Sequence, residues 1–428
     1  MALADRFGQR VVTLCALYFA QGLPWGFMTI ALISFLTSRG MGESEAGELA
    51  AIVLLPWTFK LVWAPLIDTV TIRSMGRRRP WIIGAELMMA VTMLGLILMG
   101  DLTHDLKLLG WMFFIHNCFA SLQDVSTDAL AVDVLPRSEH GRVNGFMWGS
   151  KLVGKGVGAA VMAQVMAAWG LSAAVLLQFI LLLVIMLVPL MVLERAGEKR
   201  FPWSAGGADK TAQEASLCNP LEVLKDLARG FALQATLAFA VVGTVKTIGH
   251  GLAEIVSKTL YTQQLGWSFV ELSVFMGYAV IPEFIGAVGG GFLADRFGRR
   301  YLLTISLVCY AAFTIAFGSF PNLWTETWFA TLYLVLYPGI FAVVTVSYLS
   351  LSMRISWTRS TATMFTTYMT LSNVGHVIGN WLAGPVRGSF SFEASFVLAG
   401  VLTLVTLLPL MMVTLRQVDE QRAADSST

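Results

Sequence analysis

The sequence is short of charged residues. Asp, Glu, Lys and Arg make up 13% of its 428 residues, whereas hydrophobic residues make up 56% and the mean hydropathy is +0.70. Soluble globular proteins carry about 25% charged residues, so the composition excludes that class and indicates a chain that crosses a membrane many times. The four cysteines fall within expected spans or in the central loop, so we expect no disulfide.

Motifs for bound cofactors are missing as well. The sequence has no HExxH, no pair of CxxC motifs and no glycine-rich phosphate loop. All but one of the connections between apolar runs are short, which leaves no room for a soluble catalytic domain. We therefore expect no metal ion, no cofactor and no enzymatic activity. The expected partners are a small solute, protons and the lipid bilayer, with no nucleic acid.

Apolar runs fill most of the chain. Each is long enough to cross about 30 Å of hydrocarbon as a helix. The twelve expected spans are 10–36, 48–71, 80–100, 109–135, 143–169, 171–193, 231–264, 268–294, 300–320, 324–352, 360–386 and 391–415. If the N-terminus is inside, 21 of the 29 Lys and Arg residues lie inside, and the opposite face has Arg39, Lys107 and Arg387. The excess of positive charge in cytoplasmic loops then places both termini in the cytoplasm.

One long polar connection divides the chain. We expect a six-helix bundle over 1–193, a cytoplasmic linker over 194–230 and a second six-helix bundle over 231–428. Within the linker, residues 219–230 place leucines at helical spacing with basic residues between them, which is typical of an amphipathic helix on the membrane surface. An ordinary solvated linker fits equally well.

An acidic–basic turn occurs twice. Residues 64–79 read APLIDTVTIRSMGRRR and residues 290–300 read GGFLADRFGRR. In each copy an Asp at the end of an apolar run precedes a basic turn, and the two aspartates are 295 − 68 = 227 residues apart. Two related halves in a hydrophobic chain indicate an all-α membrane transporter built from parallel repeats.

The repeated turn predicts a cytoplasmic gate. A carboxylate at a helix end can accept hydrogen bonds from a neighbouring helix N-terminus and from loop arginines, and this contact must break when the cytoplasmic side opens. The expected gate residues are Asp68, Arg77, Arg78, Asp295, Arg296 and Arg299. The alternative, in which the basic residues only orient the chain in the membrane, stays open.

Charges at membrane depth are costly and indicate function. In the seventh span, four polar residues recur every four positions and so share one face of a helix: Lys246, His250, Glu254 and Lys258. We expect this stripe to face an aqueous cavity. Two interpretations remain open, namely binding of solute or protons and pairing of the charges with one another.

The fourth and fifth spans carry opposite charges. Lys151 and Lys155 lie one turn apart and need a counter-charge, which Asp124 and Asp128 in the fourth span can supply. Lys60 adds a further positive charge in the second span. A titratable aspartate beside an anion-attracting lysine is the outline of a proton-coupling site.

Other polar residues in the spans have structural expectations. Asp133 is expected to form a bridge to a lysine of an adjacent helix, and the lone histidines His116 and His376 are expected to make hydrogen bonds between helices. No cluster of a nucleophile and a base is evident among them.

At the repeated turn the sequence resembles the major facilitator superfamily, and residues 290–300 match its loop pattern closely. Within that superfamily it is similar to the branch of AmpG muropeptide permeases and acetyl-CoA transporters. The resemblance rests on YFAQGLPWGF (18–27), LLPWTFKLVWAPLIDTVTIRSMGRRRPW (54–81), FASLQDVSTDALAVDVLP (119–136) and TATMFTTYMTLSNVGHVIG (361–379). The first copy of the turn departs from the pattern, with Ala-Pro before Leu66.

The resemblance implies roles for several residues. The recurrent acid of the fourth span falls on Asp124 and Asp128, the basic position of the fifth span on Lys151, and that of the seventh span on Lys246. This chain has Lys at 151 where the family often has Arg, an additional lysine at 155, and a histidine at 250 close to where an acid is common. A lysine lacks the planar fork of arginine, so a bidentate contact to a carboxylate need not carry over.

These observations predict a proton-coupled transporter that alternates access between two bundles. Solute binding is assigned to Lys60, Lys151, Lys155, Lys246 and His250, and proton coupling to Asp124, Asp128 and Glu254. We expect a monomer in a bacterial inner membrane that imports an anionic or zwitterionic solute, a muropeptide first of all. Siderophore or metallophore import and transport of a CoA thioester or another organic anion are the alternatives. A sensor or assembly factor without transport activity is the alternative class.

Overall fold

A computed structural model describes residues 3, 6–69, 73–99, 105–135, 140–201, 203–204, 220–356 and 361–426. The side chains of two expected gate residues, Asp68 and Asp295, lie outside the described part. The helix expected over 219–230 is present as α10 (Pro220–Phe231).

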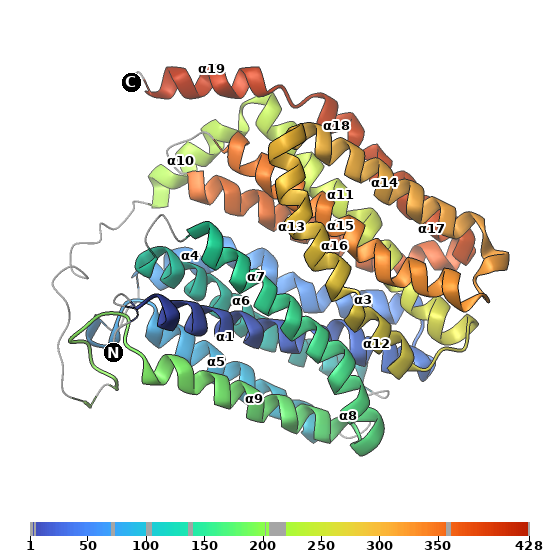
Figure 1. Ribbon diagram of the computed structural model, residues 1–428, viewed down its shortest axis with the longest axis horizontal. Helices are drawn as coiled ribbons and strands as arrows, with labels where there is room; N and C mark the ends of the chain where they lie inside the picture. Colours follow the sequence, from blue (N-terminus) through green and yellow to red (C-terminus); the bar gives the residue numbers. More distant parts are fainter. Residues whose placement is uncertain are drawn as a thin grey trace. The chain divides into compact units, whose positions relative to one another are not determined.

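Every regular element in these residues is a helix (Figure 1). Hydrocarbon offers no water to the backbone, so an apolar chain must satisfy its N–H and C=O groups within each segment, as a helix does. The first half contains α1 (Phe7–Gly26), α2 (Ile33–Ser38), α3 (Glu43–Leu54), α4 (Lys60–Thr69), α5 (Arg79–Gly95), α6 (Leu106–Val134), α7 (His140–Gly156), α8 (Met162–Trp169) and α9 (Leu171–Met191). After α10 follow α11 (Gln234–Thr259), α12 (Phe269–Tyr278), α13 (Val280–Phe297), α14 (Arg299–Ser319), α15 (Thr327–Ile355), α16 (Thr361–Ser389), α17 (Phe392–Val405), α18 (Leu407–Met411) and α19 (Leu415–Ser426).

Ten helical stretches of the described chain are long and apolar enough to cross a membrane. They correspond to ten of the twelve expected spans. The other two, 109–135 and 360–386, fall on α6 and α16, which have 29 residues each. At 1.5 Å per residue a helix of that length extends about 43 Å, more than the hydrocarbon thickness. These two helices differ from the rest because polar residues interrupt their apolar runs, and α6 carries the aspartates of the candidate site.

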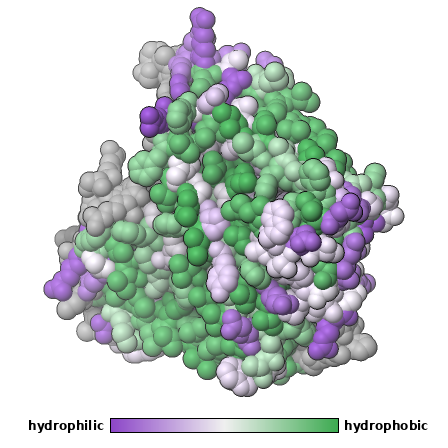
Figure 2. Space-filling view, turned by 45° about the vertical axis from the view of Figure 1, so that its right-hand side comes forward, coloured by the Kyte–Doolittle hydropathy of each residue, from purple (hydrophilic) through white to green (hydrophobic). Residues whose placement is uncertain are grey.

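The helices turn large apolar side chains outward. On α13, Ile281, Ile285 and Phe292 are 62%, 64% and 75% exposed. Figure 2 shows one face of the molecule, where hydrophobic residues cover most of the surface. A soluble protein rarely exposes so much apolar surface, whereas lipid chains match it.

The contacts divide the chain into two compact units. Unit 1 comprises Met1–Leu32 and Phe59–Leu217, and unit 2 comprises Ile33–Thr58 and Cys218–Thr428. The segment Ile33–Thr58 belongs to unit 2 because α3 packs against α16, where Glu43 pairs with Arg387 (Oε1 to Nε, 3.2 Å). The expected boundaries of the two bundles, at 193 and 231, stay a prediction. The division into units reflects which residues are close in space, and this does not test whether the two halves are repeats.

Each unit uses an arginine, buried in unit 1 and partly buried in unit 2, to cap a helix end. In unit 1 the Arg79 guanidinium donates to the carbonyl oxygens of Pro189 (2.6 Å) and Leu190 (2.9 Å) near the end of α9. In unit 2 Arg300 donates to the carbonyl oxygens of Val413 (2.7 Å) and Met411 (3.2 Å) near the end of α18. The last carbonyls of a helix have no partner within it. An arginine from each repeated turn therefore donates hydrogen bonds to the unpaired carbonyl oxygens near the C-terminal end of another helix.

A buried carboxylate completes the turn before α5. Glu194 accepts hydrogen bonds from the backbone N–H groups of Arg77, Arg78 and Arg79, each at 2.6 Å. Gly76 has a φ of 102°, and a Cβ there would lie 2.6 Å from Glu194 Oε2, so glycine is required on both grounds. Burial raises the pKa of Glu194, although the three N–H donors oppose this shift.

Glu198 lies beside Glu194 and accepts a hydrogen bond from the backbone N–H of Arg195 (3.1 Å). Burial raises its pKa from 4.5 to about 7, and the neighbouring charge of Glu194 acts in the same direction. A raised pKa in the folded state means that the folded protein binds the proton more tightly than the unfolded chain. The corresponding stability is fully present below pH 4.5 and is lost as the pH rises through about 7.

Glu198→Gln, which resembles the protonated acid, should therefore leave the melting temperature nearly unchanged at pH 5 and raise it at pH 8. Thermal unfolding of the purified protein in detergent at both pH values measures this difference. Glu48→Gln, at an exposed position on α3, is the matched control and should have the same effect at both pH values. An equal difference at pH 5 and pH 8 for Glu198→Gln would contradict the assignment.

Candidate functional site

Three buried charges meet inside unit 1. Asp124 of α6 accepts from Lys60 of α4 through Oδ2 and from Lys151 of α7 through Oδ1, the second contact at 3.2 Å. Asp124 is 2% exposed, Lys60 8% and Lys151 5%. One carboxylate thus bridges two ammonium groups from two other helices. We call these three residues the unit 1 charge cluster.

A fourth charge lies one helical turn away. Asp128 follows Asp124 on the same face of α6, and its Oδ1 accepts a hydrogen bond from the Tyr18 hydroxyl of α1. With Asp128 the two aspartates balance the two lysines. Asp128 is only partly buried, whereas Asp124 is fully enclosed. Asp128 is thus the more accessible of the two acids.

Aromatic rings surround the lysines of α7. The Lys151 Nζ lies 5.5 Å from the ring centroid of Tyr18, 5.7 Å from that of Trp25 and 5.6 Å from that of Trp148. Lys155, one turn further along, lies 5.5 Å from the same Trp25 ring. Cation–π contacts of this kind are attractive without neutralising the charge. Lys151 and Lys155 thus approach the same Trp25 ring from successive turns of α7.

Close packing of α1 on α7 positions Lys151. Gly22 lies against the backbone of Lys151, and a Cβ there would come 2.8 Å from the Lys155 nitrogen. In return, a Cβ at Gly154 would lie 2.5 Å from the Phe19 carbonyl oxygen. Small residues on both surfaces let two transmembrane helices approach at backbone distance. Larger residues here would move the lysine helix away from α1.

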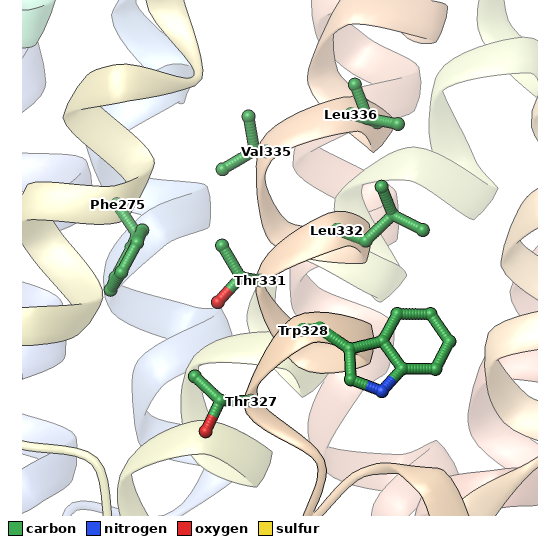
Figure 3. A pocket seen from close by; sticks show the side chains of 7 residues that line it. All are labelled: Phe275, Thr327, Trp328, Thr331, Leu332, Val335 and Leu336. Carbon is green, nitrogen blue, oxygen red and sulfur yellow. The ribbon is translucent and has the colours of Figure 1, made fainter.

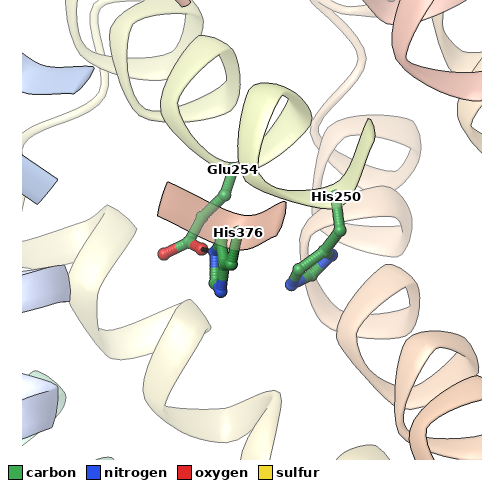
Figure 4. A group of neighbouring side chains, drawn as sticks. All are labelled: His250, Glu254 and His376. Atoms are coloured by element: carbon green, nitrogen blue, oxygen red, sulfur yellow. Dashed lines mark hydrogen bonds and ion pairs between the residues drawn. The ribbon is translucent and has the colours of Figure 1, made fainter. Parts of the chain in front are cut away.

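The expected stripe of α11 is present in unit 2. Glu254 Oε1 accepts from Lys258, whose side chain is fully buried, at 2.8 Å. Glu254 Oε2 is 2.9 Å from Nε2 of His376 on α16, and His250 Nδ1 is 2.9 Å from the Tyr310 hydroxyl. Figure 4 shows the two α11 side chains and His376 gathered in one place. The stripe therefore pairs partly within itself and partly with α16.

Lys246 differs from the rest of the stripe. It is 2% exposed, and its Nζ lies over the rings of Tyr348 (4.6 Å) and Phe341 (5.5 Å). Among the described residues no carboxylate forms an ion pair with it. Lys246 is thus a buried lysine held over two aromatic rings, which makes it a candidate for contact with an anion.

The described gate residues contact helix ends. Arg78 Nε donates to Asp133 on α6 at 2.9 Å, so Asp133 pairs with an arginine and not with the lysine that the sequence predicted. Arg299 donates to the Ser350 carbonyl oxygen of α15 at 3.2 Å. Arg296 lies 5.5 Å from the Phe297 ring, and Arg77 contributes its backbone N–H to Glu194. The gate role of these residues stays a prediction.

Sequence reasoning missed several residues of these clusters. His376 and His116 were expected to make hydrogen bonds between helices. His116 contacts Thr92 (3.0 Å) and His376 contacts Glu254, but the sequence did not indicate that His376 joins the charged stripe of α11. Tyr18 gave no signal, because a tyrosine in an apolar run is common. Glu194 is separated by many residues of sequence from the turn whose N–H groups it accepts, so the sequence did not predict this contact.

Two apolar cavities lie apart from the charges. One, of about 540 Å³, is lined by residues of α12 and α15 (Figure 3): Phe275, Thr327, Trp328, Thr331, Leu332, Val335 and Leu336. The other, of about 370 Å³, lies between α5 and α6 beside Trp81 and Phe119. Neither is lined by a charged residue, and Trp328 is 60% exposed. Both are suited to lipid chains and not to an anionic solute.

Loss of the central carboxylate should strongly destabilise unit 1. Asp124→Asn leaves Lys60 and Lys151 buried near each other without their shared counter-charge, which typically costs about 3–5 kcal/mol. Thermal unfolding in detergent should show a large drop in melting temperature. The double variant Asp124→Asn with Lys60→Met should recover much of it. Asp133→Asn, at a partly exposed pair, is the control with a small effect; equal drops for Asp124→Asn and Asp133→Asn would contradict the account.

Known proteins resemble the chain in sequence and in fold. The sequence model of the Major Facilitator Superfamily matches residues 14–380 and, in an overlapping match, 258–428. The anhydromuropeptide permease of Escherichia coli (strain K12) is 33% identical over 136 residues, which are 31% of this chain and 26% of the permease. An uncharacterized protein of Haemophilus influenzae is 27% identical over 144 residues, 33% of each chain. This chain thus spans about a quarter to a third of the length of these relatives.

Solved structures extend the likeness to the whole fold. A point mutant of the nucleoside transporter NupG superposes with a TM-score of 0.72 at 14% identity, over 94% of this chain and 100% of that chain. NupG itself gives a TM-score of 0.70 at 13% identity, over 94% and 98%. At such identities the likeness concerns the fold alone. The match to the family along most of the sequence settles the question of kinship: the chain belongs to the Major Facilitator Superfamily of membrane transporters.

Proposed function

We propose that the protein is a proton-coupled importer of an anionic or zwitterionic solute, with a muropeptide as the first candidate. The family is one of transporters, and the partial similarity to the anhydromuropeptide permease supports the choice of solute. We also propose that the protein is a monomer in a bacterial inner membrane, with both termini in the cytoplasm.

The observation that carries the proposal is the position of Asp124 between two lysines. A solute carboxylate competes with Asp124 for Lys60 and Lys151. Protonation of Asp124 removes its charge and releases the lysines for the solute. Binding of anion and binding of proton therefore favour each other, which is the requirement for symport.

Asp128 and Tyr18 provide the path for the proton. Asp128 is the more exposed acid, lies one turn from Asp124 and holds the Tyr18 hydroxyl. Asp128 is proposed to take up the proton, and the loss of its charge then acts electrostatically on Asp124 one helical turn away. Glu254, between Lys258 and His376, is the corresponding acid of unit 2.

The other lysines supply further contacts to the solute. Lys155 of α7 and Trp25 of α1 lie next to each other beside the unit 1 charge cluster, and the Trp25 and Trp148 rings can pack against sugar faces. Lys246 and His250 offer a second anion contact from α11. Transport is proposed to proceed by alternating access, as in other secondary transporters. The contacts of Arg78 with Asp133 and of Arg299 with Ser350 are the ones proposed to break on cytoplasmic opening.

Uptake by proteoliposomes tests the proposal. Vesicles with an imposed inward proton gradient should accumulate labelled anhydromuropeptide, and an uncoupler should abolish the accumulation. Lys151→Ala should lower uptake at least about tenfold, because it removes a buried charge that contacts the solute. Glu48→Gln, on the exposed face of α3, should leave uptake unchanged.

Two results would contradict the proposal. Uptake that persists with the uncoupler would exclude proton coupling. Absence of uptake for muropeptides, siderophores and CoA esters alike would favour a sensor or assembly factor.

A further inference from the structure

The group formed by His250, Glu254 and His376 has the composition of a metal site. One ligand atom from each residue lies within 4.8 Å of the others. Figure 4 shows the three side chains converging from two helices. Two imidazoles and one carboxylate are the donors that zinc and similar transition metals prefer, whereas magnesium and calcium favour oxygen ligands alone.

The backbone fixes the three ligands. His250 and Glu254 are four residues apart on α11 and so lie on one face of the helix. His376 comes from α16, 122 residues further along the chain. Gly251 allows the approach, because a Cβ there would lie 2.7 Å from the His376 carbonyl oxygen and 2.8 Å from its ring. The ligands thus stand on two helices in close contact, which is the rigid support that a metal site needs.

Outer contacts orient two of the ligands. The Tyr310 hydroxyl holds His250 Nδ1 at 2.9 Å, and the His250 ring stacks on Phe341 with centroids 3.6 Å apart and planes at 4°. In the tautomer that donates Nδ1–H to Tyr310, the electron pair that binds an ion is on Nε2. Lys258 holds Glu254 Oε1 at 2.8 Å, which directs Oε2 toward His376. Partners of this kind are typical around metal ligands and fix their orientation.

We propose that His250, Glu254 and His376 bind one divalent transition-metal ion of the zinc, cobalt and nickel class. All three side chains are partly exposed, so an ion can enter from solvent. The ion would replace the hydrogen bond between Glu254 and His376. Three protein ligands leave a coordination position for water or for an anionic donor group. The site shares His250 and Glu254 with the solute and proton roles proposed above, but metal binding is measured without solute or transport, so either proposal can fail without the other.

Cobalt binding to the purified full-length protein, with any affinity tag removed, tests the inference. Co²⁺ should give visible d–d absorption that saturates at one ion per chain and disappears on addition of excess Zn²⁺. Glu254→Gln and His376→Asn should each weaken binding at least about tenfold, and Tyr310→Phe, which loses an orienting contact, should weaken it by a similar factor.

His116→Asn is the matched control, because it changes a histidine on α6 that contacts Thr92 and is not one of the three proposed ligands. It should bind Co²⁺ like the unchanged protein, and elution of each variant as a single species establishes that it folds. Absence of cobalt binding, or equal binding by the unchanged protein and both ligand variants, would overturn the proposal and leave the cluster as an ion pair with histidine neighbours.

Discussion

The structure of unit 1 depends on the neutralisation of buried charge. Lys60, Asp124 and Lys151 come from three helices, and none of them could be withdrawn from water alone without a large free-energy cost. Their pairing requires α4, α6 and α7 to meet at one depth. The tight packing of α1 on α7, through glycines on both surfaces, keeps Lys151 within reach. The ion pairs of the unit 1 charge cluster can therefore form only when these helices pack closely.

The two units share packing devices but not charges. Arginines at the two basic turns cap the ends of α9 and α18 in the same way. Glycines bring α11 against α16 as they bring α1 against α7, with Gly375 and Gly379 against the backbone of α11. The acids and lysines follow no such repetition: unit 1 has two lysines on one aspartate, whereas unit 2 has a glutamate between a lysine and a histidine. The arginine caps and the glycine contacts therefore recur in both units, whereas the charged clusters differ.

Much of the fold could be predicted from the sequence, because each helix that crosses a membrane requires a long apolar run. Ten of the expected spans correspond to apolar helices, and the two that do not are α6 and α16, whose polar residues point to the sites. The pairing of Asp124 with a lysine was also predictable, since buried like charges need a counter-charge. The partners of Asp133, Glu194 and His376 were not, because each depends on a distant residue whose position follows from packing. For Asp68 and Asp295 the expected gate contacts fall outside the described side chains.

Solute and proton are proposed to bind to the unit 1 charge cluster, each favouring the binding of the other. Calorimetric titration of the transported solute, in buffers that differ in ionisation enthalpy, counts the protons exchanged on binding. If the solute carboxylate displaces Asp124 from its lysines, the observed enthalpy should vary with the buffer and report net proton uptake. Asp128→Asn should reduce that uptake. An enthalpy independent of the buffer would contradict the account.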